Sequence, residues 1–93
     1  MSKRKIERLR EQQAALKEQI CSNLDLLIGS VNRSPAMMNY NLTTKVDGKT
    51  VTRYVRKNLV PTVKKMTSRH KEVRSLIQHL SKVNWELLKL ESE

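Results

Sequence analysis

The sequence predicts a mostly α-helical protein in which two long antiparallel helices flank a small β-hairpin. Three observations predict this fold: an apolar repeat of helical spacing toward each end of the chain, an Asp-Gly pair between two β-rich runs, and the absence of Gly from both repeats. The whole chain, residues 1–93, is expected to form a single domain. A chain of this length buries a limited fraction of its surface, so long helix contacts or a second subunit are needed for stability.

The first repeat predicts a helix over residues 2–28. No Pro or Gly interrupts this segment, and Gln13 lies on the same helical stripe as the apolar side chains. The alternating spacing of four and three fits a coiled-coil seam, which a polar Gln weakens. Gly29 follows at the position of a left-handed C-terminal cap, so the helix is expected to end there. The apolar members of the stripe are Ile6, Leu9, Leu16, Ile20, Leu24 and Leu27.

Residues 29–39 are expected to form a connector. They contain Ser34 and Pro35, a pair that interrupts regular structure, and they have few periodic apolar positions. Met37 and Met38 are expected to fill gaps at the end of the core, because flexible Met side chains adapt to irregular spaces.

Residues 40–55 predict a β-hairpin. Asp47 and Gly48 separate two runs rich in Thr, Val, Leu and Tyr, and this dipeptide is typical of a two-residue type I′ turn, in which both residues have positive φ. Such a turn fixes the register, with Val46 opposite Lys49 and the pairing continuing outward from there. One face of the hairpin is then apolar and must pack on a helix, because an isolated hairpin is only marginally stable in water.

The second repeat predicts a helix over residues 59–90, with Asn58 as its N-cap and Pro61 in its first turn. This helix is close in length to the first, so the two can lie antiparallel with the hairpin inserted between them. Its apolar residues cover more of the circumference than one partner helix can hide. We therefore expect self-association, most simply a two-fold dimer that forms a four-helix assembly. The stripe contains Leu59, Val63, Met66, Val73, Leu76, Ile77, Leu80, Val83, Leu87 and Leu90, with His70 and Asn84 interrupting it.

Positive charge is concentrated in one part of the chain. The sequence has 19 Lys and Arg against 9 acidic residues, a net charge of +10, and residues 45–74 alone hold ten of the basic residues against two acidic ones. Lys57, Lys64 and Lys71 are spaced by seven, so in a helix they lie near one line, on the side away from the apolar stripe. The candidate nucleic-acid-binding residues are Lys49, Arg53, Arg56, Lys57, Lys64, Lys65, Arg69, Lys71 and Arg74.

Such a surface favours a small accessory protein that binds nucleic acid, without catalysis, through its hairpin and helix face. Lys and Arg release counterions from a phosphate backbone, and a two-stranded ribbon fits the major groove, which favours DNA over RNA. The alternative is a helical adaptor or assembly subunit that binds an acidic protein surface. Two other interpretations stay open: a basic face that only solvates the protein, and a weaker one in which it binds an anionic membrane surface.

Catalytic and metal-binding patterns are absent from the sequence. The Gly-Lys-Thr of residues 48–50 resembles the end of a phosphate-binding loop, but Thr43 stands where that loop needs Gly. His70 and His79 have no metal-ligand spacing with Cys21, and no paired carboxylates or nucleophile with a base can be assembled. The protein is therefore expected not to be an enzyme and to need neither a cofactor nor a metal.

The cysteine content and the N-terminal segment predict the compartment. Cys21 is the only cysteine, so no intramolecular disulfide can form, which suits a reducing cytoplasm. The first residues are basic but have no apolar run behind them, and no apolar stretch is long enough to span a bilayer. We expect a cytoplasmic protein with no membrane partner.

Four short motifs precede a long helix that changes from basic to amphipathic: Gly-Ser-Val at residues 29–31, Tyr-Asn-Leu at 40–42, Gly-Lys-Thr at 48–50 and Tyr-Val at 54–55. In this order they resemble a family of small bacterial and archaeal proteins, some of them encoded beside transposases. The resemblance covers residues 24–87. It implies a context linked to DNA or to mobile elements, and it supplies no activity and no functional residues.

Overall fold

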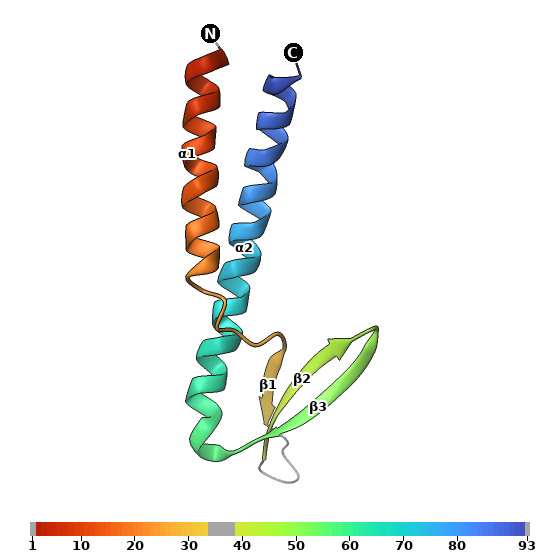
Figure 1. Cartoon of the computed structure of the whole chain (residues 1–93). Coiled ribbons are helices and arrows are strands. Elements are labelled where there is room, and N and C mark those ends of the chain that lie inside the picture. The colour runs from red at the N-terminus through yellow and green to blue at the C-terminus, as the bar shows by residue number, and fades with distance from the viewer. Residues whose placement is uncertain (1, 34–38, 93) are drawn as a thin grey trace. The chain divides into compact units, whose positions relative to one another are not determined.

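A computed structural model describes residues 2–33 and 39–92 of the chain. Its elements, in chain order, are helix α1 (Ser2–Cys21), strands β1 (Ser30–Arg33), β2 (Tyr40–Val46) and β3 (Lys49–Val55), a 3-10 turn η1 (Lys57–Leu59) and helix α2 (Val60–Glu91) (Figure 1). The prediction of a mostly helical chain with two helices is confirmed. The chain divides into two compact units, which we name the helical unit (Met1–Leu24 and Glu72–Glu93) and the sheet unit (Asp25–Lys71).

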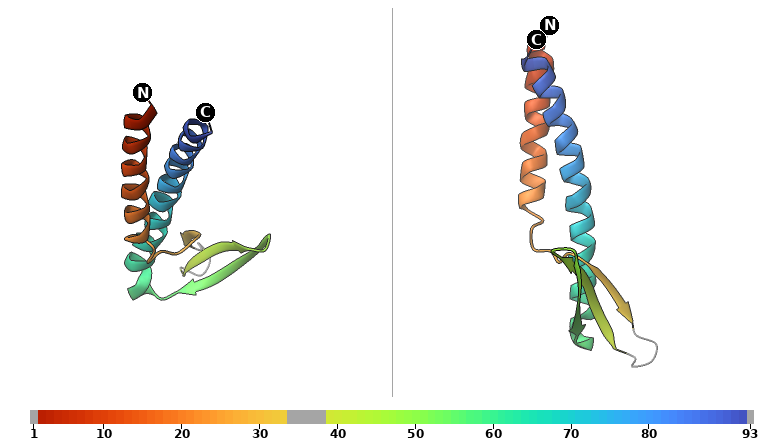
Figure 2. Two further views of the ribbon diagram at one scale, coloured as in Figure 1. Left: turned by 45° about the horizontal axis from the view of Figure 1, so that its top comes forward. Right: turned by 90° about the vertical axis from the view of Figure 1, so that its right-hand side faces the viewer.

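In the helical unit, α1 lies beside the last part of α2 and runs antiparallel to it (Figure 1, Figure 2). Leu16 of α1 is buried together with Val83 and Leu87 of α2. Their helical spacing places these side chains on one stripe of each helix, which is why the two helices can bury them together. The half-buried residues around this core are Ile6, Leu9, Leu76 and Leu80.

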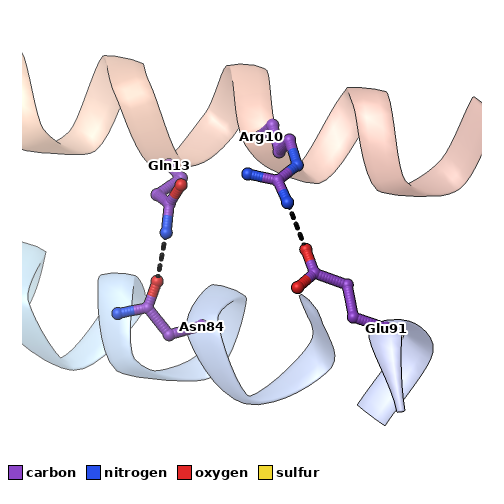
Figure 3. Close-up of polar contacts among 4 residues, drawn as sticks. All are labelled: Arg10, Gln13, Asn84 and Glu91. Carbon is purple, nitrogen blue, oxygen red and sulfur yellow. Dashed lines mark hydrogen bonds and ion pairs between the residues drawn. The ribbon is translucent and has the colours of Figure 1, made fainter. Parts of the chain in front are cut away.

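Two polar residues that interrupt the predicted apolar stripes lie opposite each other in the helical unit. Nε2 of Gln13 donates a hydrogen bond of 2.8 Å to Oδ1 of Asn84 (Figure 3). Toward the end of α2, the guanidinium of Arg10 forms an ion pair with the carboxylate of Glu91. The hydrogen bond between Gln13 and Asn84 thus favours one register of the seam, as polar residues at coiled-coil seam positions do.

Helix α1 ends at Cys21, well before the predicted end at residue 28. The side chains of Ser22 and Asn23 donate hydrogen bonds of 2.9 and 2.7 Å to carbonyl oxygens of the last helical turn. Such side-chain bonds satisfy those carbonyls and compete with a further turn of helix. The predicted helix end and the predicted cap at Gly29 are therefore wrong.

The sheet unit contains a three-stranded antiparallel sheet in the order β1-β2-β3, where the sequence predicted two strands. The additional strand β1 lies in the predicted connector and pairs with β2 from Ser30 opposite Thr43 to Arg33 opposite Tyr40. A third strand supplies support that an isolated hairpin lacks. Four connector residues with predicted roles lie outside the described part of the chain: Ser34, Pro35, Met37 and Met38.

The hairpin formed by β2 and β3 has the predicted turn and the predicted register. Asp47 and Gly48 both have positive φ, 52° and 79°, as a type I′ turn requires. Val46 pairs with Lys49 beside the turn, and the pairing continues without a shift to the open end of the hairpin. The predicted hairpin is therefore confirmed, residue pair by residue pair.

One face of the sheet is apolar and packs against the first turns of α2 (Figure 2). Leu42 of β2, Val55 of β3 and Val60 of α2 are buried together. Because side chains alternate between the two faces of a strand, the opposite face carries Ser, Thr, Asn, Tyr and Lys side chains. The sheet thus has one packed face and one polar face. The half-buried residues around the core are Leu27, Val31, Tyr40 and Val63.

Gly29 allows the chain to enter β1 very close to β2. Its φ is 143°, and a Cβ atom at this position would lie 2.5 Å from the carbonyl oxygen of Thr43 and 3.1 Å from Cδ1 of Leu42. Any other residue would meet both a strained backbone and a clash with a neighbouring backbone atom. The glycine that the sequence assigned to a helix cap is needed instead for the packing of the sheet.

Helix α2 begins at Val60, one residue after the predicted start, and Pro61 lies in its first turn as predicted. Before it comes the turn η1, which is preceded by Arg56 in an extended conformation without a side-chain cap. Asn58 lies inside this turn, so its predicted role as the helix N-cap is wrong. The tight turn takes the chain from β3 into α2 within a few residues.

Candidate nucleic-acid interface

The two units differ in charge. The sheet unit, residues 25–71, holds ten Lys or Arg against Asp25 and Asp47, a net charge of +8. The helical unit holds the other nine basic residues and seven acidic ones, a net charge of +2. Most of the positive charge of the protein therefore belongs to the sheet unit.

Eight of the nine predicted binding residues lie in the sheet unit, and seven of these eight are exposed. Lys49 and Arg53 are on β3, and Arg56 and Lys57 lie at the junction between β3 and α2. Arg74 is the exception and belongs to the helical unit. The remaining four of the eight residues in the sheet unit lie on the first turns of α2: the exposed Lys64, Lys65 and Lys71 and the half-buried Arg69.

The predicted line of three lysines is only partly formed. Lys57 lies in η1 and not in α2, so the spacing of seven along one helix applies to Lys64 and Lys71 alone. Nζ of Lys64 lies 5.7 Å from the centroid of the Tyr40 ring, and Cζ of Arg33 lies 5.9 Å from the same centroid. The expectation that Lys64 points away from the packed side of the helix is therefore wrong, because this side chain borders the sheet.

Arg69 makes a structural contact that the sequence did not reveal. Its Nη1 donates a hydrogen bond of 2.6 Å to the carbonyl oxygen of Asp25. The backbone N–H of Leu27 donates a second bond, of 3.2 Å, to the carbonyl oxygen of Met66. Both bonds tie the segment that enters β1 to helix α2. Arg69 thus supports the packing of the sheet unit in addition to its charge.

The basic side chains of the sheet unit have no acidic partner among the described residues. The ion pairs found there join Arg10 to Glu91 and Lys89 to Glu86, and all four residues belong to the helical unit. Exposed charges of one sign on a small unit raise the local electrostatic potential and attract ligands of the opposite sign. The sheet unit is therefore suited to a polyanion.

The polar face of the sheet adds hydrogen-bonding groups beside this charge. The sequence indicated Thr43, Thr52 and Tyr54 for this role, and the register places all three on the polar face. Strand β1 adds Ser30 and Asn32 to the same face. Hydroxyl and amide side chains commonly contact phosphate and sugar oxygens in protein–nucleic acid complexes. The unpredicted strand thus enlarges the polar part of the candidate surface.

A pocket of about 450 Å³, which we name the end pocket, lies where β1 ends, β2 begins and β3 passes into η1. Two basic residues, Arg33 and Lys57, and two aromatic residues, Tyr40 and Tyr54, line it, and the register places the side chains of Tyr40 and Tyr54 on opposite faces of the sheet. Sequence reasoning missed the pocket because Arg33 fell in the predicted connector. The hairpin register was the signal in the sequence that pointed to this region, because it places Tyr40 and Tyr54 in adjacent cross-strand rows at the open end of the hairpin. The other lining residues are Asn39 and Val55.

Comparisons with protein-family models, with curated proteins and with solved structures find no match to this chain. None of the described helices is both long and apolar enough to cross a bilayer. Within residues 2–33 and 39–92, no group of three or more His, Cys, Asp or Glu side chains is arranged to hold a metal ion. What the sheet unit can bind follows from its own charge and geometry.

Proposed function

We propose that this chain is a small non-catalytic accessory protein that binds nucleic acid through its sheet unit. The observation that carries the proposal is a net charge of +8 on residues 25–71, with no ion pair among the described residues of that unit. A phosphate backbone is a polyanion that suits such a surface, because bound Lys and Arg release its condensed counterions. The mobile-element context implied by the short sequence motifs belongs to the same proposal.

The tip of the hairpin supports the preference for duplex DNA. Strand β1 pairs with β2 only as far as Thr43, so residues 44–51 continue beyond it as a two-stranded ribbon. A ribbon of this kind fits the major groove of B-DNA. Lys45 and Lys49 lie on this ribbon and are exposed, so both can reach phosphates on either side of a groove.

The proposal is tested by titrating labelled duplex DNA, single-stranded DNA and RNA with the full chain and following fluorescence anisotropy. If six of the basic side chains contact phosphates, duplex affinity is expected to fall about a thousandfold between roughly 50 and 200 mM salt. The affinity is expected to depend little on sequence, since phosphate contacts position a protein without identifying bases. A folded protein that binds none of the three at the lower salt would contradict the proposal and favour an acidic protein surface as the partner.

We also propose that the protein forms a two-fold dimer through an exposed apolar stripe on the helical unit. Ile77, Trp85 and Leu88 are 51%, 59% and 59% exposed. Their spacing of eight and three places them on one side of α2, away from the stripe that contains the buried Val83 and Leu87. Contact between this stripe and its copy in a second chain would produce a four-helix assembly and remove the exposed apolar surface from water.

Replacing Trp85 and Leu88 together with Ser is expected to shift the protein from dimer to monomer, because these side chains supply apolar contact area between copies. Sedimentation velocity over micromolar concentrations measures the shift. Leu24→Ser is a matched control, since Leu24 is 57% exposed but follows the end of α1 and lies outside the stripe. An unaltered protein that sediments as a monomer throughout this range would contradict the dimer.

A further inference from the structure

The end pocket combines positive charge with an available aromatic surface. The ring of Tyr40 already has two cations close to it, Arg33 at 5.9 Å and Lys64 at 5.7 Å. Tyr54 is 64% exposed, and no cation contact with its ring is found among the described residues. One ring of the pocket is thus occupied by side chains of the protein, while the other presents a large surface to solvent.

The register explains why these groups meet at one end of the sheet. Arg33, Tyr40 and Val55 lie side by side across the three strands, and Tyr54 belongs to the adjacent row. Lys57 follows only two residues after Val55, where η1 turns the chain toward α2. The side chains of Arg33, Tyr40 and Val55 belong to the packed face, so the pocket residues outside that face include Tyr54, with its exposed ring, and Lys57 of η1.

We infer that the end pocket binds one unstacked nucleotide of a single-stranded nucleic acid, with the base on the ring of Tyr54 and the neighbouring phosphate held by Lys57. The volume of about 450 Å³ is within the range of pockets for small ligands. Every base has an aromatic face, so stacking on a Tyr ring requires no particular sequence. This inference rests on the proposed nucleic-acid-binding function and specifies the strand state that one site prefers.

Duplex DNA is not expected to stack a base in this pocket. The bases of a duplex are stacked on one another, and their faces are not available to a side chain unless the stack is opened. The hairpin tip, which we assign to duplex contacts, is at the other end of the same two strands, beside the Asp47-Gly48 turn. A change at Tyr54 can therefore separate base stacking from duplex binding, whereas phosphate contacts such as that of Lys57 are expected in both modes.

The direct test is Tyr54→Ala, with Tyr54→Phe and Ile28→Ala as matched controls. Tyr54→Phe retains the ring, and Ile28 is an exposed apolar residue outside both the end pocket and the hairpin ribbon. For single-stranded oligonucleotides of thymine or uracil, Tyr54→Ala is expected to raise the dissociation constant by roughly fivefold to a hundredfold, the usual range for one stacked base. Both controls and the duplex affinity of all three variants are expected to stay close to those of the unaltered protein.

A fluorescent reporter provides a second readout that does not depend on affinity. Trp85 is the only tryptophan, so the double variant Trp85→Phe with Tyr54→Trp places the single indole in the end pocket. A base stacked on this indole is expected to quench its emission, whereas a duplex bound at the hairpin tip is expected to leave it unchanged. The DNA and RNA oligonucleotides are compared in the same assay, since a 2′-hydroxyl changes the sugar and not the stacking surface.

The outcomes separate this inference from the function on which it rests. If Tyr54→Ala binds single strands as tightly as the unaltered protein, or loses duplex affinity to the same degree, the nucleotide assignment of the pocket is wrong while nucleic-acid binding stands. If the unaltered protein binds no nucleic acid at all, the proposed function fails and the inference fails with it. Lys57→Gln is expected to reduce the salt slope for single strands by about 0.7, as the loss of one phosphate contact requires.

Discussion

Changing Arg53, Arg56, Lys57 and Lys64 together to Gln is expected to lower duplex affinity by up to about three orders of magnitude at about 0.1 M salt. Each phosphate contact contributes about 0.9 to the slope of log affinity against log salt, so the loss of four contacts should reduce that slope by about 3.6. All four side chains are exposed and belong to the unit that carries a net charge of +8. Anisotropy titrations at several salt concentrations measure both quantities.

A variant with the same loss of charge in the helical unit is the matched control for this experiment. Lys3, Lys5, Arg8 and Lys17 are exposed on α1 and have no ion pair among the described residues. Their replacement with Gln is expected to change affinity and salt slope far less, because screening weakens charges that do not touch the ligand. Equal losses in the two variants would show that total charge matters and would contradict the assignment of binding to the sheet unit.

Gly29→Ala is expected to destabilise the sheet unit by at least about 2 kcal/mol, the cost of a residue held in a sparsely populated backbone conformation, with a steric clash in addition. The new Cβ would lie 2.5 Å from the carbonyl oxygen of Thr43, which is backbone and cannot rotate away. Relief of the clash requires β1 to move from β2 and disturbs the contact with Leu42. Thermal and urea unfolding followed by circular dichroism measure the change.

Gly48→Ala isolates the backbone contribution in the same assay. Gly48 also has positive φ, 79°, but a Cβ atom there would meet no atom within 4 Å. Its expected cost is about 1 to 2 kcal/mol, from backbone conformation alone. An equal effect at both positions would show that the close approach of Gly29 to Thr43 contributes nothing to stability.

The hairpin could be predicted in detail because its determinants are local. Asp47 and Gly48 define the turn, and a two-residue turn sets every later pair by counting outward along the two strands. The same holds for the first turn of α2. Pro61 lacks a backbone N–H, and an N–H in the first turn of a helix would have no intrahelical acceptor. These features depend on neighbours in the sequence and on no distant contact.

The end of α1 and the strand β1 could not be predicted in this way. Leu24 and Leu27 continue the apolar helical period, but Leu27 packs instead against the core of the sheet unit and donates its backbone N–H to Met66. Strand β1 has only Val31 as an apolar residue, so its pairing with β2 depends on tertiary contacts rather than on its own composition. Local periodicity is overridden where a distant element offers better packing.

The same distinction between local and distant determinants applies to the candidate site. The basic residues on β3, η1 and α2 were identified from the sequence. They are close together along the chain, and they stay close in space because their segment folds into one compact unit. The contact of Lys64 and Arg33 with the Tyr40 ring, and the pocket beside it, depend on the pairing of β1 with β2 and on the packing of α2. No spacing in the sequence contains that information.

The uncompensated charge of the sheet unit also affects how this unit responds to dissolved ions. Like charges held close together oppose the compact state, so added salt should stabilise the fold of residues 25–71 by screening their mutual repulsion. Salt is therefore expected to have opposite effects on two equilibria: it should strengthen folding and weaken the proposed attraction to phosphates. A bound polyanion neutralises the same charges and stabilises the folded state by mass action. In dilute buffer, the proposed polyanionic ligand and added salt are thus alternative sources of counter-charge for this small unit.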